Sequence, residues 1–420
     1  MNLPDRAWTL LNQALDVYAD SPRAINWLRR HLARFTDPLR LAVVGGPATG
    51  KSTLVNAIAG ECVATEGGQG MAWYQVPPAR SQSPLTLIDT PAVGPDMEPG
   101  AVESICMEAD AVLYLMGHPH NADLAFLRAV QDHPVARVAA VNSVAVLSRA
   151  DELGGGRVDA LISARQVARK YRKEGELSVL CQDVIAVAGL AASGGRTLSD
   201  DEFELLAGLA AAPKEELEPL LLSADRFAAD PERERLLGRF GLFGIRLAVT
   251  LIRRGADTRA ALSTQLAQRS GLGDLRDAIS LYFTDRAPVL KARSALIGLD
   301  VVLRMEPRPS AAPLVGELER TLAGAHEFHE LRLLATVSTG RVRLPEELRE
   351  EAIRLAGGYG LQPQERLGAQ VQGPPLRQAA AAALRVWRAY SENPVFGAAE
   401  RHAARTVARS CEALITEPAP

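Results

Sequence analysis

A glycine-rich octapeptide, GGPATGKS at residues 45–52, constrains the fold of this chain more than any other feature. It fits the pattern G-x-x-x-x-G-K-[ST] and lies between an apolar run, LRLAVVG, and a stretch of helical character, KSTLVNAIAG. Glycines let the backbone curl so that successive N–H groups point inward, and the N-terminus of the following helix adds partial positive charge. The alternative, a glycine turn with an exposed lysine, leaves the flanking strand and helix unexplained. The octapeptide therefore predicts a phosphate-binding loop.

The sequence predicts specific roles for two side chains of this loop and for one carboxylate that follows it. Lys51 is expected to reach the β- and γ-phosphates of a nucleotide, and the Ser52 hydroxyl to ligate Mg²⁺. Asp89 ends a second apolar run, PLTLID, and such a strand end is where a phosphate-loop protein places its Mg²⁺–water ligand. An Asp after a strand is also a common cap or turn residue, but its pairing with the glycine loop favours the metal role. The residues expected at the phosphates are Gly45, Gly46, Pro47, Ala48, Thr49, Gly50, Lys51, Ser52 and Thr53.

The segment VLSRADE addresses the base of the nucleotide. GTPases usually carry [NT]-K-x-D after such a strand, because the carboxylate accepts two hydrogen bonds from guanine that adenine cannot donate. Ser148, Arg149 and Asp151 form a relaxed version of this motif, in which Arg149 would cover the base and Asp151 would keep the discriminating charge. A surface Arg–Asp pair is the alternative. In the run DVIAVAG, Ala188 and Gly189 fall where GTPases present backbone N–H groups to the guanine oxygen.

Short apolar runs and amphipathic stretches alternate through the first half of the chain, which predicts a mostly parallel sheet with helices on both faces. The predicted strands are LRLAVVG, MAWYQV, PLTLID, DAVLYLM, NSVAVLS and DVIAVAG. Residues 4–36 show helical periodicity, as one kinked helix or two, with Ser21 and Pro22 marking a cap and a first turn. We expect a helical segment at 1–36, an α/β P-loop GTPase domain at 37–212 and an α-helical bundle or stalk-like region at 213–420, with the first and last packed together.

Composition and charge restrict the class of protein further. The chain has 47 basic and 50 acidic residues, a net charge of −3, which gives no field to draw in nucleic acid, so no nucleic-acid partner is expected. The four cysteines are far apart without a CxxC pair, which predicts a cytosolic protein without disulfides or a zinc site. The most apolar later run is short and interrupted by Arg246, so no membrane span is expected. Its glycines, Gly238, Gly241 and Gly244, indicate close helix packing rather than membrane insertion.

With the glycine loop, the strand-end aspartate, SRAD and DVIAVAG in this order, the chain resembles the bacterial dynamin-like GTPases. It looks most like the actinobacterial branch that includes the isoniazid-induced dynamin-like proteins. Helical segments such as FGLFGIRLA, RSGLGDLRDAI and APVLKARSAL look like the same branch, so the resemblance covers nearly the whole chain. It implies GTP or GDP and Mg²⁺ as ligands, and a GTPase domain beside a bundle of flanking helices. It also implies self-association through both parts and remodelling or bridging of membranes, often with a paired dynamin-like protein.

Three departures from the family pattern concern hydrolysis rather than binding. Pro47 and Ala48 stand where relatives carry polar residues that hold a charge-compensating cation or the attacking water. Thr65 is the only threonine of the first switch segment and a weak candidate for its role, since it sits early. In the second switch, Ala92 replaces the glycine of D-x-x-G. The sequence therefore predicts GTP binding with slow or partner-dependent hydrolysis, and it identifies no catalytic residue.

Two alternatives stay open at this point. The first is a non-catalytic GTP-binding partner, a pseudo-GTPase that acts by association with a paired dynamin-like protein, which the three departures favour. The second is an ATP-using P-loop protein, which requires SRAD to be accidental. We expect the chain in the cytoplasm, and the resemblance adds peripheral contact with lipid at the inner face of the cell membrane. No lysine-rich or aromatic loop tip indicates which segment would make that contact.

Overall fold

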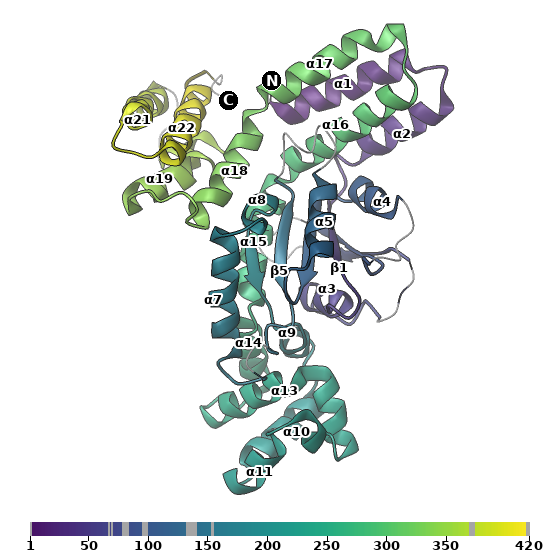
Figure 1. The fold of residues 1–420 in the computed structure, drawn as a ribbon, viewed down its shortest axis with the longest axis vertical. Helices are drawn as coiled ribbons and strands as arrows, with labels where there is room; N and C mark the ends of the chain where they lie inside the picture. Colours follow the sequence, from purple (N-terminus) through teal and green to yellow (C-terminus); the bar gives the residue numbers. More distant parts are fainter. Residues whose placement is uncertain are drawn as a thin grey trace.

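A six-stranded sheet occupies the middle of an elongated molecule, with groups of helices at both of its ends (Figure 1). The computed structural model describes residues 2–65, 68, 70–77, 84–94, 100–131, 141–152, 155–368 and 374–416. The strand order is β2-β3-β1-β4-β5-β6, in which β2 runs antiparallel to β3 and all other pairs are parallel. The strands are β1 (Leu39–Gly45), β2 (Ala72–Val76), β3 (Leu85–Asp89), β4 (Ala111–Met116), β5 (Ser143–Leu147) and β6 (Val184–Ala186).

All six predicted strands are present, and the prediction of a mostly parallel sheet is confirmed. β4 and β5 are buried along their whole length, as expected for continuous apolar runs in a sheet covered on both faces. Because β1, β3, β4, β5 and β6 run in the same direction, their carboxyl ends meet at one edge. The loops that leave this edge begin after Gly45, Asp89, Leu147 and Ala186, which brings the predicted site segments together.

Helices cover both faces of the sheet. On one face, α3 (Lys51–Ala59) and α15 (Leu272–Tyr282) share a hydrophobic core with β1, β3 and β4. The other face is covered by α4 (Ala101–Glu108), α5 (Asn121–Val130), α7 (Ala160–Lys173) and α8 (Leu177–Leu180). The fold class predicted for this part of the chain is therefore confirmed.

A four-helix group packs against one end of the sheet (Figure 1). It joins α1 (Leu3–Val17) and α2 (Pro22–Ala33) to α16 (Ala287–Met305) and α17 (Ala312–Gly324), with the short 3-10 turns η1 (Thr284–Arg286) and η2 (Pro309–Ala311) beside α16 and α17. The Ser21 side chain accepts a hydrogen bond from the Ala24 N–H, so the N-terminal segment is two helices with a cap between them. The N-terminal helices thus lie against helices from the second half of the chain.

A second helical group, which we call the arm, lies at the opposite end of the sheet (Figure 1). The arm consists of α10 (Asp200–Ala211), α11 (Lys214–Leu220), α12 (Ala224–Phe227), α13 (Pro231–Arg253) and α14 (Arg259–Arg269), and it contacts α9 (Gly189–Arg196). The glycines of α9 allow this contact, since a Cβ on Gly194 would lie 2.6 Å from the Phe240 ring and one on Gly195 would lie 2.8 Å from Leu266 Cβ.

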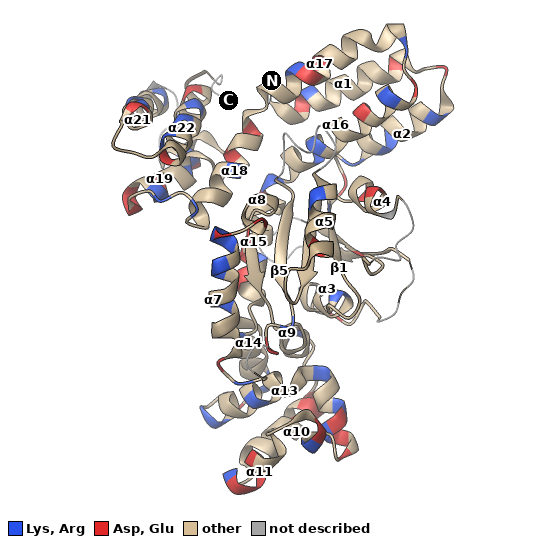
Figure 2. Cartoon of the chain, in the orientation of Figure 1, with Lys and Arg blue, Asp and Glu red and all other residues tan. Residues whose placement is uncertain are grey.

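A third group surrounds its own hydrophobic core near the C-terminus. It contains α18 (His326–Ser338), α19 (Glu346–Leu355), α20 (Pro363–Leu367), α21 (Pro374–Glu392) and α22 (Ala398–Thr416). The segment 213–420, expected as one bundle, thus divides among the three helical groups and the sheet, which α15 covers. An apolar stripe predicts a buried helix face but not the partner that buries it. Acidic and basic residues are interspersed along the outer helices, and the strands carry few of either (Figure 2). None of the helices within the described ranges is long and apolar enough to cross a membrane.

Candidate nucleotide site

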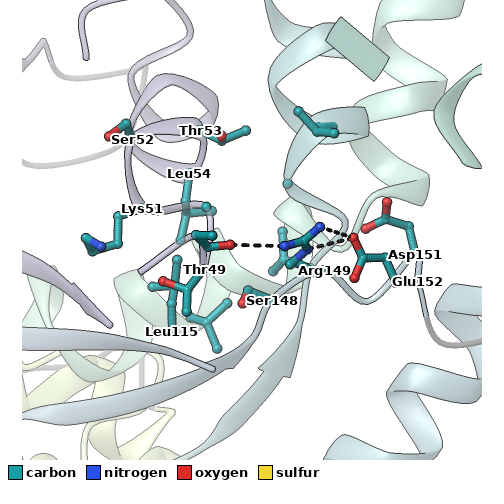
Figure 3. A pocket seen from close by; sticks show the side chains of 16 residues that line it. Thr49, Lys51, Ser52, Thr53, Leu54, Leu115, Ser148, Arg149, Asp151 and Glu152 are labelled. Carbon is teal, nitrogen blue, oxygen red and sulfur yellow. Dashed lines mark hydrogen bonds and ion pairs between the residues drawn. The ribbon is translucent and has the colours of Figure 1, made fainter. Parts of the chain in front are cut away.

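A cavity of about 480 Å³ opens at the carboxyl edge of the sheet (Figure 3). One end is formed by the loop after β1 and the first turn of α3, and the other by the loop after β5 and the start of α9. Its volume falls in the range of small-molecule sites. The two ends bring together segments that sequence analysis assigned to the phosphates and to the base. The lining residues are Ala48, Thr49, Gly50, Lys51, Ser52, Thr53, Leu54, Leu115, Val146, Ser148, Arg149, Asp151, Glu152, Val187, Gly189 and Leu190.

The phosphate loop is shaped by short local contacts. Gly50 has a φ of 83° and directly precedes α3, and Ala48 also has a positive φ, 56°, which is uncommon for a residue with a side chain. A Cβ on Gly45 would lie 2.5 Å from the Leu115 carbonyl oxygen, so β4 admits only glycine there. Gly45 and Gly46 are not among the lining residues, and Pro47 is exposed outside them. The predicted loop is present, but only its residues from Ala48 onward line the cavity.

Lys51 is turned back onto its own loop. Its Nζ donates hydrogen bonds to the carbonyl oxygens of Gly45, at 3.2 Å, and Gly46, at 3.1 Å. Partial burial lowers the pKa of the Lys51 ammonium group, and the nearby Asp89 carboxylate acts in the opposite direction. Because neutral carbonyls are weaker partners than phosphate oxygens, the ammonium group is available for exchange onto a phosphate at the helix N-terminus.

Ser52 and Asp89 lie together although 37 residues separate them in the sequence. The Ser52 hydroxyl donates to Asp89 Oδ2 at 2.8 Å, while Asp89 Oδ1 is buried without a hydrogen-bond partner among the described residues. Burial raises the pKa of Asp89, and the Ser52 hydrogen bond and the Lys51 charge lower it. An orphaned buried carboxylate oxygen next to a hydroxyl is a donor set of the kind that Mg²⁺ prefers. The residues present therefore fit the predicted metal.

Arg149 spans the cavity between its two ends (Figure 3). Its Nη1 donates to the Ala48 carbonyl oxygen at 3.3 Å, and its Nε donates to Glu152 Oε1 at 2.6 Å. The Arg149 backbone has a φ of 52°, a left-handed conformation. The alternative of a surface pair between Arg149 and Asp151 does not describe this arrangement, because the ion pair is made with Glu152.

Asp151 and Ser148 are the polar side chains at the base end that no other described side chain contacts by a hydrogen bond. The part-buried Asp151 carboxylate accepts a hydrogen bond from its own backbone N–H but from no described side chain, and burial raises the pKa of Asp151. The Ser148 hydroxyl is buried and lacks a partner among the described residues. A buried hydroxyl usually has a partner, so the Ser148 side chain in this cavity favours a ligand that supplies one.

The structure separates the two residues expected near the guanine oxygen. Gly189 lines the cavity, and a Cβ on it would lie 3.7 Å from Thr53 Cγ2. Ala188 does not line the cavity, and its N–H donates to the Ser270 carbonyl oxygen at 2.9 Å. This corrects the expectation for Ala188: its N–H is consumed by the contact between the end of the sheet and the segment before α15.

The two switch segments start from fixed points beside the phosphate loop. Asn56 of α3 accepts hydrogen bonds from the N–H groups of Val63 and Ala64 at 2.8 and 2.7 Å, which places Thr65 at the exposed end of an anchored turn. In the second segment, the Val93 N–H donates to the Gly45 carbonyl oxygen at 3.0 Å, and Ala92 is exposed beside it. Residues 66, 67 and 69 of the first switch segment lie outside the described residues. Asn56 was not predicted, and only its place one turn into α3 could have indicated it.

Comparison with known proteins gives this chain relatives along its whole length. It is 31% identical to the isoniazid-induced protein IniC of Mycobacterium tuberculosis (strain CDC 1551 / Oshkosh) over 488 aligned residues, which cover 99% of both chains. The protein of the same name from strain ATCC 25618 / H37Rv matches with the same identity and coverage. A family model described as "50S ribosome-binding GTPase" matches residues 40–143, which include the phosphate loop and Asp89.

Two solved structures of bacterial dynamins resemble the chain more distantly. The LeoA bacterial dynamin GTPase from ETEC has a TM-score of 0.29 and 11% sequence identity, and the match covers 98% of this chain and 68% of that one. A structure described as an oligomerised bacterial dynamin pair, for sensing and tethering membranes, has a TM-score of 0.28 and 14% identity, with 84% and 77% covered. These similarities are too low to carry an argument, so the family assignment rests on the full-length sequence relatives.

Proposed function

The chain belongs to the isoniazid-induced branch of the bacterial dynamin-like GTPases, and on that premise we propose that it binds GTP with Mg²⁺ and hydrolyses it slowly. The observation that carries this proposal is the single cavity that joins Lys51 and Ser52 at one end to Ser148 and Asp151 at the other. A nucleoside triphosphate needs both ends, one for its charge and one for its base. The Asp151 carboxylate, to which no described side chain donates a hydrogen bond, is the group that selects guanine.

Mg²⁺ would be held by Ser52 and Asp89, whose side chains already lie 2.8 Å apart. When bound, the metal neutralises charge on the β- and γ-phosphates. Lys51 binds the same phosphates, the start of α3 orients them, and the hydrophobic side chains Leu115 and Val187 shield the inner wall of the cavity from water.

Hydrolysis is proposed to be slow because the positions that would act on the γ-phosphate are poorly equipped. Pro47 and Ala48 are exposed and carry no polar side chain, so neither side chain can hold a cation or a water molecule. Loss of one transition-state contact typically costs about 10²- to 10³-fold in rate. A partner chain that covers the exposed loop would be able to supply the missing groups.

An equilibrium titration with labelled GTP and ATP in the presence of Mg²⁺ tests the binding proposal. We expect GTP to bind at least tenfold more tightly than ATP, because adenine offers no pair of donors to the Asp151 carboxylate. Equal affinity for the two nucleotides would contradict the guanine assignment and favour the ATP-using alternative.

A second candidate function is supported by the same exposed Pro47 and Ala48. In it, GTP is a structural ligand and the chain acts as a pseudo-GTPase by association with a paired dynamin-like protein. Single-turnover hydrolysis, measured for the chain alone and with its paired chain, separates the candidates. A rate equal to that of free GTP in both mixtures would leave only the binding role.

Self-association and remodelling or bridging of membranes are the parts of the proposal furthest from the site. They rest on the family, and no described helix spans a bilayer, so contact with lipid would be peripheral. Sedimentation with anionic liposomes, with and without GTP, measures this directly. Failure to pellet in either state, with the paired chain also present, would remove the membrane role and leave the nucleotide site unaffected.

A further inference from the structure

Helix α13 contains an interior break that helix packing alone does not require. Its residue Gly241 has φ 64° and ψ 165°, in the middle of 23 helical residues. This region of backbone conformation is open essentially to glycine alone. The sequence showed three glycines in α13, and the structure gives each a different environment. A Cβ on Gly244 would lie 3.4 Å from Ala191 Cβ, as predicted for close packing, while one on Gly238 would touch nothing within 4 Å.

The break at Gly241 lies against the base end of the cavity. A Cβ there would lie 3.3 Å from Leu190 Cδ1 and 3.5 Å from Asp151 Oδ2, two residues that line the cavity. The second half of α13 begins directly after the break, so its first N–H groups have no acceptor within the helix. Asp151 therefore lies beside the backbone of Gly241 and the first residues of the second half of α13, both of which belong to the arm.

The second half of α13 also makes hydrogen bonds to the segment that follows Asp151 in the sequence. Arg246 donates to the carbonyl oxygens of Gly155 at 3.0 Å and Gly156 at 2.5 Å, and its Nε donates to Leu221 at 3.0 Å. Its described partners are all carbonyl groups, and burial lowers the pKa of its guanidinium group. A Cβ on Gly156 would lie 3.6 Å from the Phe243 N atom. The loop after β5 is thus bounded by β5 on one side and by α13 on the other.

We propose that Gly241 is a positioning residue for guanine: its backbone break seats the second half of α13 against Asp151 and so fixes the carboxylate for the base. This inference rests on the proposed GTP site and adds that the arm is part of it. A side chain at position 241 would strain the backbone, lie tightly against Leu190 and come into van der Waals contact with Asp151. Coupling of this kind is reciprocal, so guanine bound at Asp151 also stabilises the break in α13.

The test compares Gly241→Ala with Gly255→Ala in the full-length chain. Gly255 follows α13, has a φ of 102° and has open space around it, so its variant carries similar backbone strain away from the cavity. Affinities are measured for GTP and for inorganic tripolyphosphate, both with Mg²⁺. We expect Gly241→Ala to weaken GTP binding by about tenfold or more, as loss of one charge-assisted contact would, and to change tripolyphosphate binding less than about twofold. Gly255→Ala is expected to leave both affinities unchanged.

GTP affinity of Gly241→Ala within twofold of the parent would overturn the inference, and so would an equal loss of GTP and tripolyphosphate binding. Should Gly241→Ala fail to fold, Arg246→Met tests the same point, with an expected loss of about three- to tenfold for GTP only. Equal effects of Arg246→Met on both ligands would again overturn it. The proposed function is tested separately by titration of the unsubstituted chain: equal affinity for GTP and ATP would contradict it.

Discussion

The two ends of the nucleotide cavity are built in different ways. The phosphate end comes from one short segment, in which β1, the glycine loop and α3 follow one another without interruption. The base end is assembled from the loop after β5 and the start of α9, with the break in α13 packed behind Leu190 and Asp151. A local unit is shaped by its own sequence, whereas an assembled one depends on tertiary packing. The phosphate end should therefore tolerate changes in the arm that the base end does not.

The largest effect is expected at the phosphate end, from Lys51→Ala. The variant removes the ammonium group that would bind two phosphates, so affinity for GTP, ATP and tripolyphosphate should all fall by about 10²- to 10³-fold. Isothermal titration with the three ligands measures this. A selective loss of GTP alone would show that Lys51 does not act at the phosphates.

At the base end, Asp151→Asn is expected to weaken GTP binding by about 10²-fold and to leave tripolyphosphate binding unchanged. The Asn amide can donate to the carbonyl that xanthine carries where guanine has its amine, so affinity for xanthosine triphosphate should rise above that of the parent. This gain controls for misfolding. If xanthosine triphosphate binds no better to the variant, Asp151 is not at the exocyclic group of the base.

A smaller effect on GTP affinity is expected from substitution of Arg149, which contacts both ends of the cavity. Arg149→Ala removes the contact with the Ala48 carbonyl oxygen and the cover over the base, at a cost of about three- to tenfold in GTP affinity. Arg149→Lys keeps the stem and the charge and should recover most of the loss. Identical affinities of both variants, whether high or low, would show that the Arg149 side chain does not cover the base.

The smallest expected effect is on pH dependence. Burial raises the pKa of both Asp89 and Asp151 above the ordinary value of 3.8. Ligand binding needs the ionised carboxylates, so affinity is full above the raised pKa values and falls as pH is lowered through them. Unfolding of the ligand-free chain has the opposite sign: the folded state takes up its protons first, so it gains stability over the same interval.

The two ends can be separated in the same titration. Tripolyphosphate affinity should report Asp89 alone, and GTP affinity should report Asp89 and Asp151 together. In Asp151→Asn the two ligands should therefore follow the same pH curve. A steeper curve for GTP in that variant would assign the additional proton to another group.

The contrast between the ends also explains what the sequence could predict. All six strands, the glycine loop and the partnership of Ser52 with Asp89 follow from local pattern, because strand ends in a parallel sheet share one edge. The occupied N–H of Ala188 and the break at Gly241 could not be predicted. Both depend on contacts with residues far along the chain, Ser270 in one case and Asp151 in the other.

The arrangement of helices shows the same limit. Periodicity predicted that the helices after residue 213 are amphipathic, and they are, but their apolar faces turn to three different cores. The apolar face of a helix predicts that this surface is buried, but it does not predict which other element buries it. Gly241 illustrates this limit most clearly. From the sequence alone, a glycine in an apolar run is compatible with close helix packing, with a bend in the helix or with neither.

Hydrogen exchange measured with GTP and with tripolyphosphate, each with Mg²⁺, tests most directly whether the arm belongs to the base end. We predict that both ligands protect the amides of residues 45–53, and that only GTP protects those of 148–152 and 241–246. Protection of 241–246 by tripolyphosphate to the same degree, or no protection there with saturating GTP, would contradict the account.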